Sequence, residues 1–208
     1  MDFIIPKIYP ITDVRISGIS HAEQVERLIA GGATLIQLRD KHAGPNDFYN
    51  AAVEAIRIAR THSVRIIIND RVDIALAANA DGVHLGQDDL SLSAGRKLMG
   101  KKIVGISTHD LDQARAAECG GADYIGFGPM FGTRTKATVY EARGPEMLKQ
   151  IRGAVRVPIV AIGGITEENI QQVWQAGADS AAIISDILHN DDPGAKVMRI
   201  LAQRQSYS

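Results

Sequence analysis

The 208-residue chain has little of what would tie a protein to a special environment. Its one cysteine, Cys119, excludes an internal disulfide and is too few for a thiolate metal site. No apolar run approaches membrane-spanning length, and the apolar stretch at residues 1–6 is too short for a signal-peptide core. The net charge of −1 gives no reason to expect nucleic acid or an anionic membrane as a partner. We therefore expect a cytoplasmic protein that recognises charged ligands through local sites.

The chain also lacks a Pro/Ser-rich linker and low-complexity segments, so we predict one domain over residues 1–208. Short apolar runs alternate with amphipathic segments along its whole length. The eight runs are 7–11, 34–38, 66–68, 82–85, 103–106, 124–127, 159–162 and 180–184. Strict alternation implies parallel strands joined by crossover helices. Eight units favour a single-domain (β/α)8 TIM barrel of compact length, and an open doubly wound sheet is the alternative.

The amphipathic segments carry helix-start signals. Ser20 precedes an apolar stripe and has Glu23 three residues on, which is a capping-box pattern. Pro145 suits the first turn of a helix, and Thr166 is predicted to cap the helix that runs through Trp174. The other predicted helices cover 45–60, 74–78, 93–98, 110–118 and 193–201.

In either fold the ligand site lies at the C-terminal ends of the strands, so the residues there are the candidates. Strand two ends with Gln37 and Arg39 on one face, and Lys41 follows in the loop. A guanidinium fork and an ammonium point charge both suit phosphate oxygens. The alternative is a solvated loop in which these cations pair with Asp40.

Carboxylates follow the next two strands. Strand three ends at Asn69 and Asp70, and strand four is followed by Asp88 and Asp89, which cannot both point inward easily. Two carboxylates at neighbouring strand ends, without a thiolate or histidine cluster, favour Mg²⁺, which keeps several waters and shares substrate phosphates. The alternative is helix capping, by Asp70 and by one of the later pair before Ser91.

Three further segments admit two interpretations each. Ser107 can donate to a phosphate or cap the helix near residue 110, and His84, inside a strand, is more typical of a satisfied core group than of a catalyst. The loop 128–136 can close over a ligand or be a flexible surface loop. Gly163 and Gly164 after strand seven, with Ser185 after strand eight, favour a phosphate site over a mere tight turn.

Together these residues predict two anion sites. One is the phosphate site after strands seven and eight. The other combines Arg39, Lys41 and Lys136 with Mg²⁺ on Asp70 and Asp89, which is enough positive charge for a pyrophosphate. A pyrophosphate beside a separate phosphate suggests a transfer reaction with pyrophosphate as the leaving group.

A set of motifs in this order resembles the thiamine-phosphate synthase family over nearly the whole chain. The motifs are Gln37-Leu38-Arg39-Asp40-Lys41, Asn69-Asp70, residues 81–89, Ser107-Thr108-His109, Gly128-Pro129, Thr133-Arg134-Thr135-Lys136 and Ile162-Gly163-Gly164-Ile165. The resemblance implies a (β/α)8 barrel that joins hydroxymethylpyrimidine pyrophosphate to thiazole phosphate. The products would be thiamine phosphate and pyrophosphate.

The resemblance also implies roles for individual positions. Asp70 and Asp89 match residues that hold Mg²⁺, and Gln37 matches a pyrimidine contact. The positions matching pyrophosphate contacts are Arg39, Lys41, Asn69, Ser107 and Lys136. Those matching the surroundings of the thiazole phosphate are Thr133, Thr135, Gly164, Ile184 and Ser185. The implied mechanism is dissociative, with charge stabilised by the cations and no general acid or base.

Three other functions compete with this one. A thiazole tautomerase of the same barrel family typically has a histidine where this chain has Pro129, and it tends to lose the pyrophosphate-site residues kept here. A non-catalytic phosphate-binding paralogue is a second alternative, and an unrelated barrel isomerase with an acid–base pair is a third. Gly132 and Pro145 depart from the usual family pattern near the loop, and assembly into a homo-oligomer is left open.

Overall fold

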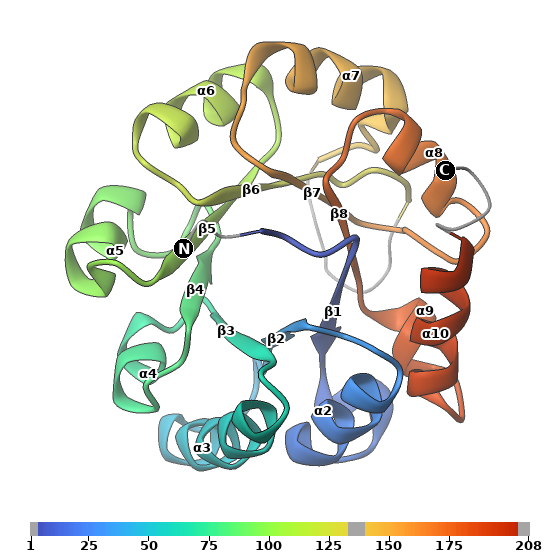
Figure 1. Cartoon of the computed structure of the whole chain (residues 1–208). Helices are drawn as coiled ribbons and strands as arrows, with labels where there is room; N and C mark the ends of the chain where they lie inside the picture. The colour runs from blue at the N-terminus through green and yellow to red at the C-terminus, as the bar shows by residue number, and fades with distance from the viewer. Residues whose placement is uncertain (1–3, 133–139, 204–208) are drawn as a thin grey trace.

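The computed structural model describes residues 4–132 and 140–203 of the chain. Eight parallel strands form a closed barrel in chain order, with β8 paired to β1 (Figure 1). The strands are β1 (Ile8–Thr12), β2 (Leu35–Leu38), β3 (Arg65–Asn69), β4 (Gly82–Leu85), β5 (Ile103–Thr108), β6 (Tyr124–Phe127), β7 (Ile159–Ile162) and β8 (Ser180–Ile183). The predicted barrel is confirmed, and the open doubly wound sheet is excluded because the edge strands of such a sheet would not pair.

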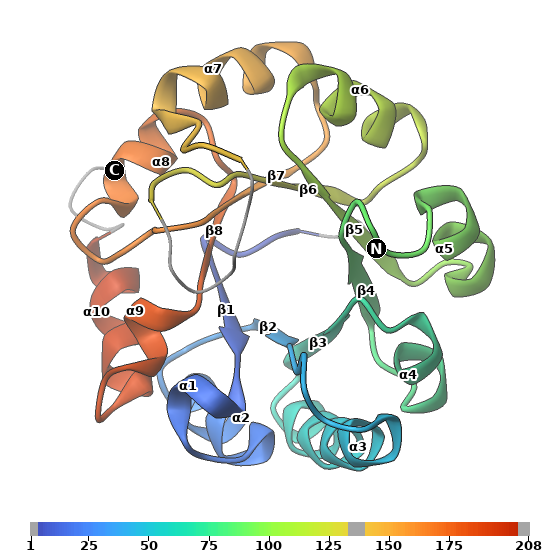
Figure 2. The same ribbon diagram turned by 180° about the vertical axis from the view of Figure 1, so that it is seen from behind.

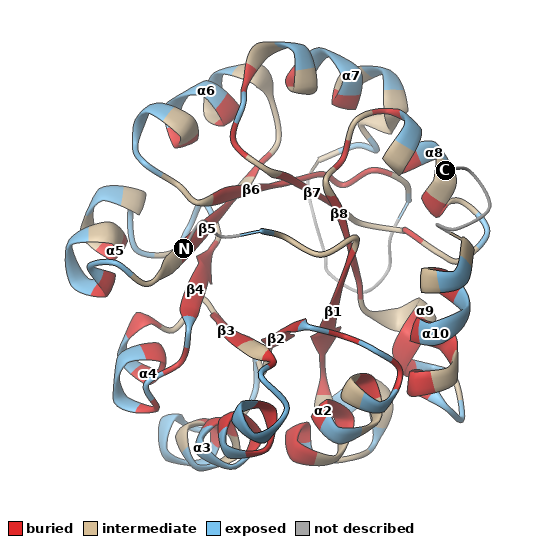
Figure 3. Cartoon of the chain, in the orientation of Figure 1, coloured by how far each residue is buried: buried red, intermediate tan, exposed pale blue. Residues whose placement is uncertain are grey.

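The apolar runs form strands because both faces of each strand are buried. In β3, Ile66 and Ile68 face the surrounding helices, whereas Ile67 faces the barrel interior, as alternation along a strand requires. Figure 3 shows buried strands ringed by helices whose outer faces are exposed. The barrel wall therefore fixes, residue by residue, which side chains point inward.

Helices surround the barrel on the outside (Figure 1). In the described residues they are α1 (Val14–Ser17), α2 (His21–Ala30), α3 (Pro45–Thr61), α4 (Val72–Ala77), α5 (Leu92–Met99), α6 (Leu111–Cys119), α7 (Gly144–Ala154), α8 (Ile170–Gln175), α9 (Ser185–Leu188) and α10 (Pro193–Gln203). Ser20 caps α2 by accepting from the Glu23 N–H at 3.2 Å, and Pro145 lies in the first turn of α7. None of the helices in residues 4–132 and 140–203 has the length and apolar character needed to cross a membrane.

One predicted helix start is wrong. Thr166 does not cap the helix that ends near Trp174, because α8 begins at Ile170. The Asn169 side chain instead accepts from the Thr166 N–H at 2.8 Å and donates to the Gly164 carbonyl at 2.9 Å. These two bonds hold residues 164–169 in a turn ahead of the helix.

Two short helices were not predicted. Both α1 and α9 have four residues, too few to show a helical period in the sequence. They follow β1 and β8, the two strands that close the barrel, and they lie close together at one end of it (Figure 2). That end carries the C-terminal ends of the strands.

Candidate functional site

A pocket opens at the C-terminal ends of the strands, with about 950 Å³ of empty space including its mouth. All eight strands, or the residues directly after them, contribute to its lining. Of the predicted site residues, the lining includes Gln37, Arg39, Lys41, Asn69, Asp70, Ser107, Gly164, Ile184 and Ser185.

The remaining predicted residues fall into two groups. Asp89 does not line the pocket but lies against Asp70 at its edge. Thr133, Thr135 and Lys136 lie outside the described residues.

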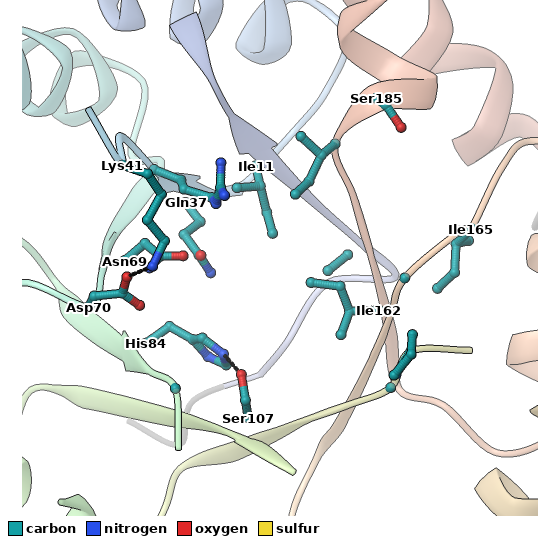
Figure 4. A pocket seen from close by; sticks show the side chains of 18 of the residues that line it. Ile11, Gln37, Lys41, Asn69, Asp70, His84, Ser107, Ile162, Ile165 and Ser185 are labelled. Atoms are coloured by element: carbon teal, nitrogen blue, oxygen red, sulfur yellow. Dashed lines mark hydrogen bonds and ion pairs between the residues drawn. The ribbon is translucent and has the colours of Figure 1, made fainter. Parts of the chain in front are cut away.

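The pocket has a polar wall and an apolar wall (Figure 4). Figure 4 shows polar side chains from β2, β3, β4 and β5, and the residues after them, gathered on one side. They include Gln37, Lys41, Asn69, Asp70, His84 and Ser107. The opposite side is formed by Ile162 and Ile165, with Ser185 above them. This division suits one ligand that is highly charged and another with an apolar ring.

Two carboxylates meet at the polar wall. Asp70 has a positive φ of 63°, which a short acidic side chain tolerates better than most, and its N–H donates to the His84 carbonyl at 2.8 Å. Its carboxylate pairs with the Lys41 ammonium. Asp89 accepts from the Gly86 N–H at 2.7 Å, while Asp88 is exposed. Burial, together with the Asp70 carboxyl within hydrogen-bonding reach, raises the pKa of Asp89 above its ordinary value.

The capping alternatives do not hold for these residues. The helices that follow Asp70, Asp89 and Ser107 are α4, α5 and α6, and other residues stand at their N-caps. Those N-cap residues are Arg71, Ser91 and Asp110. Within residues 4–132 and 140–203 no group of three or more His, Cys, Asp or Glu could hold a metal, so a cation here would rely on two carboxylates and on ligand oxygens.

Arg39 has a partner that the sequence did not predict. Its guanidinium pairs with Asp13, which also caps α1 by accepting from the Arg15 N–H at 3.0 Å. The expected partner, Asp40, instead accepts from the backbone N–H groups of His42 and Ala43 at 2.9 Å each. The position of Asp13 directly after β1 was the available signal, since the C-terminal ends of all eight strands meet at the pocket.

A hydrogen-bonded series of side chains crosses the barrel interior beneath the polar wall. The Gln37 amide nitrogen donates to the Tyr9 hydroxyl at 3.0 Å, and the hydroxyls of Tyr9 and Tyr124 lie 3.2 Å apart. His84 bonds to Tyr124 through Nδ1 and to Ser107 through Nε2, both at 3.0 Å. Burial raises the pKa of both tyrosines well above the ordinary value, so they stay neutral. The interpretation of His84 as a satisfied interior group is confirmed.

The glycines after β7 are required by packing as well as by backbone conformation. Gly163 and Gly164 have φ values of 98° and 65°. A Cβ on Gly163 would lie 2.7 Å from Pro129, and one on Gly164 would lie 2.5 Å from the Gly132 carbonyl. The segment after β6 therefore packs directly on the backbone after β7. Ser185, the first residue of α9, lines the same part of the pocket.

Comparison with known proteins gives consistent results. A family model described as thiamine monophosphate synthase matches residues 8–187. Thiamine-phosphate synthase from Chloroflexus aurantiacus is 44% identical over 94% of this chain and 91% of its own length. The enzyme of that name from Clostridium novyi is 48% identical over 89% and 92%. The structure of thiamine phosphate pyrophosphorylase from Pyrococcus furiosus matches with a TM-score of 0.88, at 34% identity and 96% coverage of each chain.

Proposed function

The chain belongs to the thiamine monophosphate synthase family and is a transferase of thiamine biosynthesis. We propose that its pocket binds hydroxymethylpyrimidine pyrophosphate and thiazole phosphate and converts them to thiamine phosphate and pyrophosphate. The observation that carries this assignment is that Arg39 and Lys41 line the pocket together with Asp70, which pairs with Lys41 and lies against Asp89. The apolar opposite wall accommodates the second ring.

The tautomerase is not favoured as an alternative. The relatives compared above are synthases, and Pro129 lines the pocket where a tautomerase typically has a histidine. A cytoplasmic location and assembly into a homo-oligomer stay predictions.

Asp70 and Asp89 fit a Mg²⁺ ion. Both offer hard carboxylate oxygens, and a divalent cation would remove the repulsion that contributes to the raised pKa of Asp89. When bound, the ion would neutralise charge that develops on the departing pyrophosphate. Lys41 now balances Asp70, so its ammonium becomes available to a phosphate once the carboxylate has another counter-charge.

The residues of the chain then bind and orient the two substrates. Gln37 holds the pyrimidine, and the pyrophosphate contacts are Arg39, Lys41, Asn69, Ser107 and Lys136. The thiazole phosphate lies among Thr133, Thr135, Gly164, Ile184 and Ser185. The bond between the pyrimidine methylene carbon and oxygen breaks, and its electron pair leaves with the pyrophosphate. The thiazole nitrogen supplies the pair that forms the new bond, so the step needs positive charge at the leaving group and no general base.

The test is an assay of thiamine phosphate formation from the two substrates by the purified protein. We expect activity to need Mg²⁺ and to disappear with EDTA. Asp70→Ala and Asp89→Ala should each lower kcat/KM by about 100-fold or more, a loss typical when a charge-stabilising group is removed. Asp88→Ala is the matched control, because that neighbouring carboxylate is exposed, and it should keep near-normal activity.

The metal site and the reaction are contradicted by different results. Full activity in EDTA or in Asp70→Ala would exclude the metal site while leaving the reaction intact. Failure of the unaltered protein to form thiamine phosphate would contradict the reaction, and an assay of thiazole isomerisation would then test the tautomerase.

A further inference from the structure

The five side chains Gln37, Tyr9, Tyr124, His84 and Ser107 form a continuous hydrogen-bonded series, here called the interior chain, which ends at the pocket on both sides. We propose that the interior chain couples recognition of the pyrimidine ring by Gln37 to recognition of the pyrophosphate by Ser107. Tyr9, Tyr124 and His84 are then positioning residues for the reaction. This inference rests on the proposed function.

The interior chain fits inside the barrel because two neighbouring positions are glycines, which have no side chain. Tyr9 and Tyr124 are 1% and 0% exposed and stand among apolar side chains inside the barrel. A Cβ on Gly105 would lie 2.1 Å from the Tyr124 ring, and one on Gly126 would lie 3.0 Å from the His84 ring. Because an unpaired hydroxyl in such surroundings costs about 1–3 kcal/mol, the hydrogen bonds of the interior chain are what allow both tyrosines to be buried here.

If every proton of the interior chain is donated to the next member, the chain has two senses. In the sense that agrees with the Gln37 amide donating to Tyr9, the Tyr9 proton points to the Tyr124 oxygen. The Tyr124 proton then points to His84 Nδ1, and the neutral imidazole carries its own proton on Nε2 and donates to Ser107. In the opposite sense every proton is reversed, and His84 carries its proton on Nδ1.

The two senses offer different groups to ligands. In the first, the Ser107 oxygen accepts from His84, so its proton is available to an anion, and the Gln37 carbonyl is available as an acceptor. In the second, Ser107 uses its proton on His84 and Gln37 turns its amide nitrogen outward. A pyrophosphate accepts hydrogen bonds only, so it selects the first sense. Gln37 then requires a ring that donates a hydrogen bond, such as an aminopyrimidine.

The first experiment measures the tautomer of His84 by ¹⁵N NMR, at a pH where histidine is neutral, with inorganic pyrophosphate as the probe. His84→Gln identifies its signals among those of the six histidines. We expect Nδ1 to be unprotonated and Nε2 to be protonated, more completely with pyrophosphate than without. In Tyr124→Phe the Nδ1 position loses its donor, so its signal should shift toward a mixture of tautomers. Tyr49→Phe, which removes a hydroxyl from α3 on the outside of the barrel, should leave both signals unchanged.

The second experiment compares kcat/KM for the aminopyrimidine pyrophosphate and for its oxo analogue. Tyr9→Phe frees the Gln37 amide to turn over, so the preference for the amino ring should fall by about tenfold, the effect of one hydrogen bond to a fixed partner. The KM for thiazole phosphate should not change, and Tyr49→Phe should keep the full preference.

Protonated Nδ1 in the pyrophosphate complex, an unchanged tautomer in Tyr124→Phe, or an unchanged preference in Tyr9→Phe would each overturn the proposed coupling. Circular dichroism of the variants separates these results from misfolding. Because the NMR measurement needs no turnover, it tests the order of protons in the interior chain even if the unaltered protein fails to make thiamine phosphate.

Discussion

Replacement of Lys196 by methionine tests how the C-terminal helix supports the part of the pocket formed after β7 and β8. The Lys196 ammonium, on α10, lies 2.9 Å from a Glu167 carboxylate oxygen and 3.1 Å from one of Asp186. The same Asp186 oxygen accepts from the Glu167 N–H at 2.8 Å. One buried ammonium on α10 therefore joins the turn after β7 to α9.

The expected loss of stability follows from the exposure of these groups. The Lys196 side chain is 11% exposed, and those of Asp186 and Glu167 are 20% and 23% exposed. Removal of one member of a fully buried ion pair costs about 3–5 kcal/mol, and an exposed pair contributes about 0–1 kcal/mol. For this partly buried cluster we expect about 2–3 kcal/mol, which lowers Tm by about 5–10 °C in a domain of this size. Methionine keeps most of the apolar contact of the lysine stem.

The control is Arg199→Met. Arg199 is also on α10, but it is 52% exposed and lies 3.5 Å from Glu167. Its loss should cost less than about 1 kcal/mol. Urea unfolding of both variants gives the two free energies. Equal losses in the free energy of unfolding would show that burial of Lys196 does not strengthen its ion pairs, and this would refute the prediction.

The pH dependence supplies a second check with a definite sign. The hydrogen bond from Lys196 holds the pKa of Glu167 below its ordinary 4.5, so the stabilisation is complete above that value and is lost as pH falls through the lower pKa of the folded state. Although burial opposes it, the bonds to Glu167 and Asp186 hold the pKa of Lys196 above its ordinary 10.5. That stabilisation is complete below 10.5 and is lost as pH rises through the higher value. The destabilisation of Lys196→Met should therefore be constant between these limits and shrink beyond either, and a flat profile would contradict the ion-pair account.

Two further predictions follow from contacts at the pocket and beneath it. Gly105→Ala should destabilise the protein by about 3 kcal/mol or more in urea unfolding, because its Cβ would meet the buried Tyr124 ring at 2.1 Å. Gly153→Ala on α7, with open space around it, should instead stabilise by about 0.5–1 kcal/mol, and equal effects of the two would contradict the packing argument. Asp13→Asn keeps a capping side chain but removes the carboxylate charge that pairs with Arg39, and since both side chains are as buried as Lys196, it should cost about 2–3 kcal/mol of stability. In steady-state kinetics it should raise the KM for the pyrimidine pyrophosphate by about tenfold, and an unchanged KM would show that Asp13 does not position Arg39.

Most of the barrel was predictable from local patterns. Strands buried on both faces require continuous apolar runs, and 66–68 is such a run in β3. The helix starts at Ser20 and Pro145 were also predictable, since a cap depends on neighbours in sequence. The start predicted at Thr166 was wrong because Asn169 closes a turn there, and two arrangements of the same polar residues compete locally.

The candidate site was predictable as a set of strand ends, but its internal pairings were not. Arg39 pairs with Asp13, 26 residues away, and Tyr9 bonds to Tyr124, 115 residues away. Nothing in the local pattern at either tyrosine distinguishes an inward-facing ring from an outward-facing one. These partners meet because the closed barrel brings every strand to a common interior.

The amino-acid sequence by itself determined the order of strands and helices and the residues at each strand end, because hydrophobic period and capping act over a few neighbouring residues. Only the tertiary structure decided that the sheet closes, that Asp89 rather than Asp88 lies against Asp70, and that Ser107 bonds to His84 instead of capping a helix. Those outcomes depend on strand register, which sets the face of each side chain and is fixed by pairing with strands that lie far away in the sequence.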